Sequence, residues 1–121
     1  MGKKILIIDD NEADLFILRR CLIHSGYNDI ITVEDPDIGF EKIKEEKPDL
    51  VILDTLLPKS NGFEICSKIR ELYGKDNPKI IIMTGSVDAV DAIKAAKVGA
   101  NDYCAKTSDC LQIIEAVKKL I

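Results

Sequence analysis

The sequence predicts an α/β fold built from five successive strand–helix units. Five apolar segments of strand length recur along the chain, at 4–8, 29–33, 50–54, 79–83 and 102–105. Two of them, "LVILD" and "KIIIM", carry a continuous apolar run rather than an alternating pattern, which is typical of strands covered on both faces of a parallel sheet. Right-handed crossovers between parallel strands then predict a three-layer (βα)₅ sandwich.

The segments between the strands carry apolar residues at helical spacing, and they predict helices over 12–24, 36–47, 62–72, 87–98 and 108–120. In the second helix, Asp35 is the expected N-cap and Pro36 the first helical residue. Gly39 in its middle indicates close packing against the sheet, because glycine otherwise costs about 1 kcal/mol there. Residues expected to face inward elsewhere include Leu15, Leu18, Leu22, Cys66, Ile69, Val90, Ile93, Leu111, Ile114 and Val117.

Length and composition indicate one globular domain over 1–121. The chain has 121 residues, is 46% hydrophobic and 31% charged, and carries a net charge of −4, which disfavours direct binding to nucleic acid. No apolar run has the length of a membrane span and the N-terminus does not resemble a signal peptide, so we expect a cytoplasmic protein. The four cysteines lack metal-ligand spacing, which favours free thiols over a zinc site.

Polar residues stand at the carboxyl ends of four of the predicted strands. Asp9 and Asp10 follow the first, Asp54 ends the third, Thr84 follows the fourth and Lys106 follows the fifth. Residues of these types are also common as turn caps. Because parallel strands bring their carboxyl ends to one edge of the sheet, where ligands bind, five together favour a functional site.

The chemistry of this set fits phosphoryl transfer. Three adjacent carboxylates repel one another unless a cation joins them, and an all-oxygen site with few protein ligands suits Mg²⁺. A lysine and a hydroxyl could then neutralise or donate to phosphoryl oxygens while one aspartate attacks the phosphorus.

With these residues the chain resembles the receiver domains of two-component response regulators, over essentially its whole length. The resemblance implies a flavodoxin-like sandwich with strand order 2-1-3-4-5. It rests on the acidic pair Asp9-Asp10, the pattern Asp54-x-x-x-Pro58-x-x-x-Gly62, Thr84 before Gly85, and Tyr103 three residues before Lys106.

The resemblance also implies a role for each site residue. Asp54 is the expected phosphoacceptor. Side chains of Asp10 and Asp54 and the backbone carbonyl of Leu56 are expected to bind Mg²⁺, with Asp9 acting directly or through water. No organic cofactor is expected.

The remaining roles concern the response to phosphorylation. Lys106 is expected to pair first with Asp54 and then with the phosphoryl group, while Thr84 swings toward that group and Tyr103 turns inward. The family usually has proline after the lysine, joined by a cis peptide, whereas this chain has Thr107. A cis bond there would cost about 2.5–4 kcal/mol, so either a strained cis loop or a rebuilt trans loop is expected.

The expected function is therefore that of a phosphorylatable switch. A sensor histidine kinase or a histidine phosphotransfer protein would phosphorylate Asp54. The signal would pass to an effector domain or partner protein through the helix at 87–98, the strand at 102–105 and the helix at 108–120. One alternative is a binding scaffold that works without phosphorylation. A second is a Mg²⁺ phosphatase, which is disfavoured because Leu56 stands where such enzymes carry a second aspartate, so no turnover of external substrates is expected.

Overall fold

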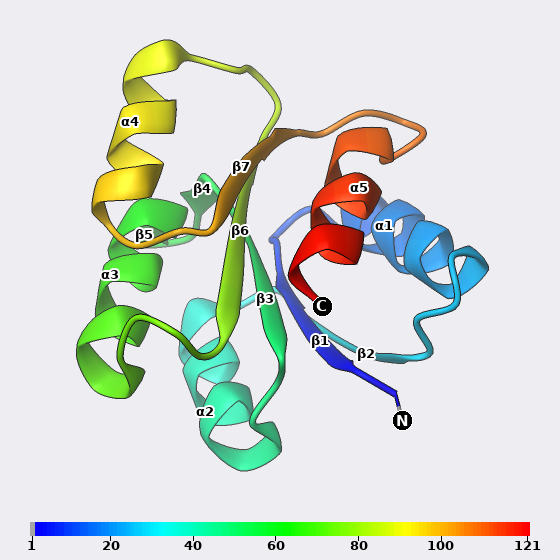
Figure 1. The fold of residues 1–121 in the computed structure, drawn as a ribbon, viewed down its shortest axis with the longest axis horizontal. Helices are drawn as coiled ribbons and strands as arrows, with labels where there is room; N and C mark the ends of the chain where they lie inside the picture. The colour runs from blue at the N-terminus through cyan, green and yellow to red at the C-terminus, as the bar shows by residue number, and fades with distance from the viewer. Residues whose placement is uncertain (1) are drawn as a thin grey trace.

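A computed structural model describes residues 2–121 as a parallel sheet covered by helices on both faces (Figure 1). Its strand order is β2-β1-β3-β6-β7, which equals 2-1-3-4-5 when only the strands of this sheet are counted, and this confirms the predicted fold. The five strands are β1 (Lys4–Ile8), β2 (Asp29–Val33), β3 (Leu50–Asp54), β6 (Lys79–Thr84) and β7 (Asp102–Ala105).

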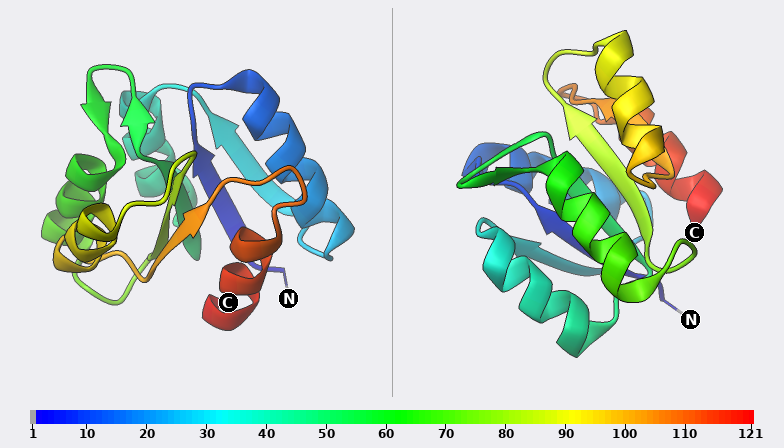
Figure 2. Two further views of the ribbon diagram at one scale, coloured as in Figure 1. Left: turned by 90° about the horizontal axis from the view of Figure 1, so that it is seen from above. Right: turned by 90° about the vertical axis from the view of Figure 1, so that its left-hand side faces the viewer.

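Five helices form the two outer layers: α1 (Glu12–His24), α2 (Pro36–Glu46), α3 (Gly62–Tyr73), α4 (Ala89–Lys97) and α5 (Leu111–Leu120). Helices α1 and α5 cover one face of the sheet, and α2, α3 and α4 cover the other (Figures 1 and 2). Within residues 2–121, no helix is long and apolar enough to cross a membrane.

The central strands are apolar apart from residues at their ends, because both of their faces are buried. In β1, Ile5 and Ile7 face the layer of α1 and α5, while Leu6 and Ile8 face the opposite layer, and all four are 0% exposed. Burying a side chain of this size stabilises the fold by about 1.5–3 kcal/mol. This two-sided burial fixes the register in which the strands deliver their last residues to one edge.

Local signals at α2 agree with the structure. The side chain of Asp35 accepts a hydrogen bond from the backbone N–H of Asp37, and Pro36 opens the helix. A β-carbon on Gly39 would collide with the side chain of Ile8 and touch Val33, so the helix does pack closely against the sheet.

For two helices, the prediction of which residues face inward was wrong in part. Val90 and Ile93 are 72% and 59% exposed, because α4 lies beside the edge strand β7 and buries only Ala95 fully. Leu111 is 57% exposed, since α5 begins at this residue rather than at 108, and Ile113 is buried instead.

A short hairpin follows β3 that the sequence did not predict. It consists of β4 (Leu56–Leu57) and β5 (Ser60–Asn61), joined through Lys59 at a positive φ of 61°. Strands of two residues are too short to show an alternating pattern. The hairpin projects beyond the sheet and leaves the side chain of Leu56 77% exposed (Figure 2).

The hairpin returns to the sheet at Gly62, where helix α3 begins. A β-carbon at this position would collide with the backbone carbonyl of Asp54, which cannot rotate away. We expect Gly62→Ala to lower the free energy of unfolding by about 1–3 kcal/mol, as forced overpacking does. Urea denaturation measures this value.

Gly39→Ala is the matched control for Gly62→Ala. The side chain of Ile8 that it would meet can turn, and alanine is favoured within a helix by about 1 kcal/mol, so a smaller loss is expected. Equal stability of Gly62→Ala and the parent protein would show that α3 is not held against the end of β3.

Candidate functional site

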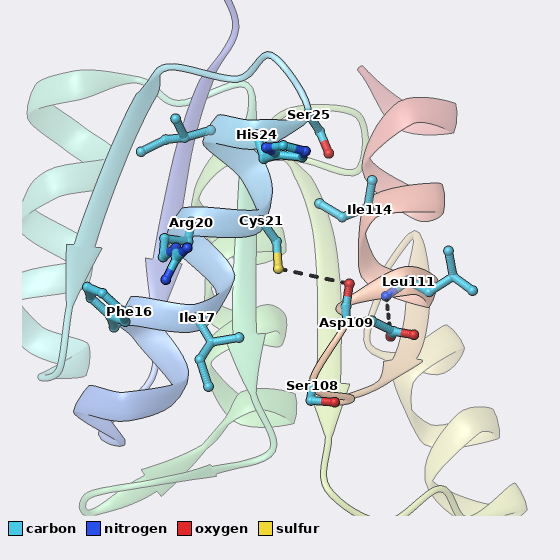
Figure 3. Close-up of a pocket in the computed structure, with 11 residues that line it drawn as sticks. Phe16, Ile17, Arg20, Cys21, His24, Ser25, Ser108, Asp109, Leu111 and Ile114 are labelled. Carbon is cyan, nitrogen blue, oxygen red and sulfur yellow. Dashed lines mark hydrogen bonds between the residues drawn. The ribbon is translucent and has the colours of Figure 1, made fainter.

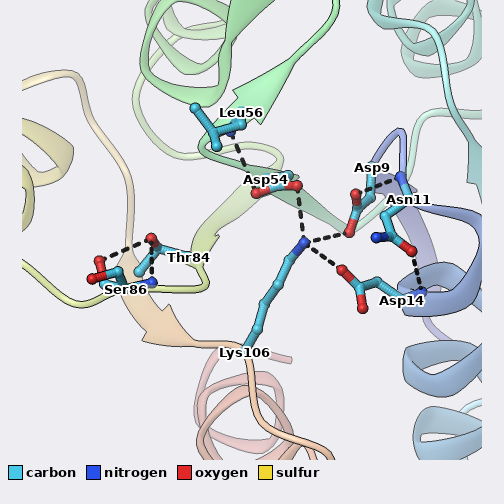
Figure 4. Close-up of polar contacts among 8 residues, drawn as sticks. All are labelled: Asp9, Asn11, Asp14, Asp54, Leu56, Thr84, Ser86 and Lys106. Atoms are coloured by element: carbon cyan, nitrogen blue, oxygen red, sulfur yellow. Dashed lines mark hydrogen bonds and ion pairs between the residues drawn. The ribbon is translucent and has the colours of Figure 1, made fainter.

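The carboxyl ends of β1, β3, β6 and β7 bring the predicted polar residues to one edge of the sheet (Figure 4). Asp9 follows β1 directly, Asp54 and Thr84 are the last residues of β3 and β6, and Lys106 follows β7. The structure thus places Asp9, Asp54 and Lys106 in direct contact, whereas Thr84 faces its own loop.

Three carboxylates form the acidic cluster of this site. One oxygen from each of Asp9, Asp10 and Asp54 lies within 4.8 Å of the others. Asp9 is 0% and Asp54 6% exposed, while Asp10 faces solvent. Water screens the two buried charges poorly, so their mutual repulsion is stronger than it would be at the surface.

The ammonium of Lys106 is the cation that faces this cluster. Its Nζ lies 2.9 Å from Asp54 Oδ2 and 2.9 Å from Asp14 Oδ2, and it donates a hydrogen bond to each. It also lies 2.8 Å from Asp9 Oδ2, in an ion pair that lacks hydrogen-bond geometry. Burial alone would lower the pKa of Lys106, but the contacts with the three carboxylates outweigh it and raise that pKa.

The negative charge of Asp9 is only partly offset by its neighbours. Burial, and to a smaller extent the neighbouring Asp54, raise its pKa to about 6, although Lys106 and the backbone N–H of Asn11 act to lower that pKa. Its Oδ1 accepts a hydrogen bond from that N–H at 2.9 Å, whereas the buried Oδ2 accepts none.

These observations fit a small, hard cation at the cluster. Mg²⁺ is bound in proteins through oxygen ligands such as carboxylates, and it leaves several of its positions to water or phosphate. Asp9 Oδ2 is a buried oxygen with an unused lone pair, and Asp10 is open to solvent on the same side. Asp9, Asp10 and Asp54 could therefore hold the ion together.

The two predicted switch residues make other contacts. The hydroxyl of Thr84 donates to the carbonyl of Ser86 at 3.1 Å and accepts from the Ser86 N–H at 3.2 Å (Figure 4). The half-buried Tyr103 accepts a hydrogen bond from the backbone N–H of Asp88, at the start of α4, through its hydroxyl. Both side chains are thus engaged with the loop between β6 and α4.

The peptide between Lys106 and Thr107 is trans. Of the two loops expected from the sequence, a strained cis loop and a rebuilt trans loop, the structure has the trans one. Within residues 2–121 the cis bond lies elsewhere, between Asn77 and Pro78. The backbone N–H of Lys106 donates to the carbonyl of Thr84 at 2.7 Å, so the loop is fixed where the lysine emerges.

Sequence reasoning missed Asp14. This residue lies in the first turn of α1, where an acidic side chain is ordinarily explained by the helix dipole. Its carboxylate instead reaches Lys106, which is 92 positions away in the chain. The one sequence signal for this role is that Asp14 lies about one helical turn after the pair Asp9-Asp10.

A separate groove of about 710 Å³ lies between α1 and α5 (Figure 3). Its walls include the exposed side chains of Phe16, Ile17 and Leu111, and the thiol of Cys21 approaches the carbonyl of Asp109 at 3.9 Å. None of the clustered carboxylates lines it, so it is distinct from the acidic site.

The fold and the acidic site together define the class of this protein. The profile of the response regulator receiver domain matches residues 5–118, so the chain belongs to this family of two-component signalling domains. A receiver domain protein from Methanospirillum hungatei, described as CheY-like, is 28% identical and superposes with a TM-score of 0.86, over 98% of this chain and 93% of that one.

Two further relatives extend this similarity. The alkaline phosphatase synthesis transcriptional regulatory protein PhoP of Bacillus subtilis is 36% identical over 100% of this chain, which spans 49% of that protein. A response regulator from Burkholderia pseudomallei, solved with a phosphorylated aspartic acid and a calcium ion, is 28% identical with a TM-score of 0.82. That alignment covers 95% of this chain and 66% of the other.

The raised pKa of Asp9 has a consequence for stability in the absence of metal. The carboxyl titrates near 3.8 when unfolded and near 6 when folded, so the folded state binds more protons between these values. The contribution of Asp9 to stability therefore falls as the pH rises from about 4 to about 6, and this loss is complete at pH 7. We expect Asp9→Asn to raise the free energy of unfolding by about 1–3 kcal/mol at pH 7 in EDTA.

Urea denaturation in EDTA at pH 5 and pH 7 measures this difference. Asp10→Asn is the matched control, because Asp10 is exposed and its charge has not been removed from water. An Asp9→Asn variant no more stable than the parent protein at pH 7 would contradict this account of the buried charge.

Proposed function

We propose that this chain accepts a phosphoryl group on Asp54 from a histidine kinase or a histidine phosphotransfer protein. The observation that carries the proposal is the position of the Asp54 carboxylate, which contacts the Lys106 ammonium and adjoins Asp9 and Asp10. Membership of the receiver family and the phosphorylated aspartic acid of the Burkholderia pseudomallei relative support it.

In the proposed reaction, Asp54 is the nucleophile. One of its oxygens forms a bond to phosphorus as the bond from phosphorus to the donor's imidazole nitrogen breaks, and the imidazole leaves with that electron pair. Lys106 neutralises charge on the phosphoryl oxygens, which is the main contribution that a protein makes to such a transfer. Bound Mg²⁺, held by Asp9, Asp10, Asp54 and the Leu56 carbonyl, would supply further positive charge there.

The conformational response is proposed to run through Thr84 and Tyr103. The Thr84 hydroxyl would exchange its contacts with Ser86 for a hydrogen bond to a phosphoryl oxygen. Tyr103 would then leave the Asp88 N–H and turn inward. Phosphorylation in this scheme favours a conformer that already exists, and a shift from 1:99 to 99:1 requires about 5.5 kcal/mol of differential stabilisation.

The proposed output surface is formed by α4, β7 and α5. Val87, Val90 and Ile93 are each more than half exposed at or near α4, which offers an apolar surface next to the switch residues. An effector domain or partner protein would read this surface. The net charge of −4 disfavours direct binding of the chain itself to nucleic acid.

A scaffold that works without phosphorylation is the second candidate, and Thr107 after the lysine is the feature that favours it. Turnover of external phosphate esters is disfavoured, because the exposed Leu56 supplies no acid beside Asp54. A response to phosphorylation separates the two remaining candidates.

Incubation with acetyl phosphate tests the proposal directly. In the presence of Mg²⁺ the parent protein is expected to gain the mass of one phosphoryl group, with the modified peptide containing Asp54. EDTA should suppress the gain, because the clustered carboxylates then lack the cation that offsets the charge of the incoming group. Asp54→Asn, which keeps the shape but loses the nucleophilic charge, should gain no mass.

Mass spectrometry of the intact protein and of its peptides provides the measurement. An unmodified parent protein, or equal modification of the parent and Asp54→Asn, would reject Asp54 as the phosphoacceptor. The scaffold would then be favoured.

A further inference from the structure

Within residues 2–121, the Lys106 ammonium donates hydrogen bonds to two carboxylates, those of Asp54 and Asp14. Asp54 is the proposed phosphoacceptor, whereas Asp14 is not among the residues proposed to bind metal or the phosphoryl group. Asp54 Oδ2 and Asp14 Oδ2 each accept from the Lys106 Nζ at 2.9 Å. Asp54 is the last residue of β3 in the buried sheet, whereas Asp14 comes from the first turn of α1. The lysine is therefore held from two independent elements of the fold (Figure 4).

The position of Asp14 is itself fixed by the cap of α1. The side chain of Asn11 accepts a hydrogen bond from the Asp14 N–H at 3.0 Å, which closes the first turn of the helix. The N-terminal end of a helix also favours a carboxylate. Asp14 thus offers a preformed negative charge at the edge of the acidic site.

The surroundings of Lys106 do not confine it by packing. A cavity of about 250 Å³ lies beside it, with Ile17, Leu18 and Met83 among its lining residues. Lysine has a flexible four-carbon stem, so an ammonium with open space beside it is placed by its charged partners. Because residue 107 is threonine, no proline ring follows Lys106 to restrain the backbone there.

The partners of Lys106 change when Asp54 is phosphorylated. Forming the acyl phosphate removes the carboxylate charge of Asp54. A cation bound at the acidic cluster competes with Lys106 for the carboxylate of Asp9. Asp14 is the one hydrogen-bonding carboxylate that this chemistry leaves unaltered. An ammonium has three donors, so Lys106 can keep Asp14 while it donates to a phosphoryl oxygen.

We propose that Asp14 is a positioning residue, which holds the Lys106 ammonium beside Asp54 before and after the phosphoryl group arrives. This role rests on the proposed function of Asp54. Without Asp14, the lysine side chain has room to move into the adjacent cavity. In a smaller fraction of the molecules, its ammonium then lies where it can neutralise a phosphoryl oxygen.

Titration with beryllofluoride, a phosphoryl analogue, in the presence of Mg²⁺ tests this role. Asp14→Asn keeps the shape of the side chain but removes its charge, and it should weaken beryllofluoride binding on the order of tenfold, since misplacing a catalytic group is costly. Asp14→Glu should recover most of the affinity. Glu12→Gln, an equal change of charge at an exposed position of the same turn, should leave the affinity within about twofold of the parent.

A second measurement on metal-free protein follows Lys106 itself. Exchange of its ammonium protons with water, observed by NMR, should be faster in Asp14→Asn than in the parent protein and in Glu12→Gln. Weaker beryllofluoride binding without faster exchange would mean that Asp14 acts through net charge, and would overturn the anchoring role. Unchanged beryllofluoride binding in Asp14→Asn would overturn it as well. Failure of the parent protein itself to bind beryllofluoride would instead overturn the proposed function, and with it the role that rests on it.

Discussion

The organisation of this molecule depends on one electrostatic constraint, a single ammonium that faces several carboxylates at the end of a buried sheet. Lys106 contacts Asp9, Asp14 and Asp54 within 2.9 Å, and Asp9 and Asp54 are almost entirely removed from water. A buried charge without a partner is costly, whereas a paired one is tolerated. The arrangement is therefore stable enough to fold and still has negative charge left to attract a cation.

The sheet fixes the positions of the residues that carry these charges. Its backbone hydrogen bonds continue past the last strand residues, from the N–H of Asp9 to Val33, of Thr55 to Met83 and of Lys106 to Thr84. The loops that carry the site are thus fixed at their base by the same pattern that joins the buried strands. The carboxylates of Asp9 and Asp54 are therefore held at this edge before any charged group binds there.

Most of the fold and the carboxylate cluster could be predicted because they depend on local signals. Apolar strands, helical stripes such as Leu15-Leu18-Leu22, and polar residues at strand ends are all visible along the chain. The two-residue hairpin strands lack any such pattern, and the exposure of Val90 follows from the place of α4 at the sheet edge. Asp14 could not be assigned to the site because its partner is distant in the chain and its own turn offers a simpler explanation.

The most direct test of the central constraint is the stability of Lys106→Met with and without Mg²⁺. In EDTA, the loss of the ammonium should lower the free energy of unfolding on the order of 3 kcal/mol, because the buried carboxylates are left facing one another. Excess Mg²⁺ should recover most of this loss by binding the same carboxylates in the folded state. An equal loss with and without Mg²⁺, measured by urea denaturation, would contradict the account.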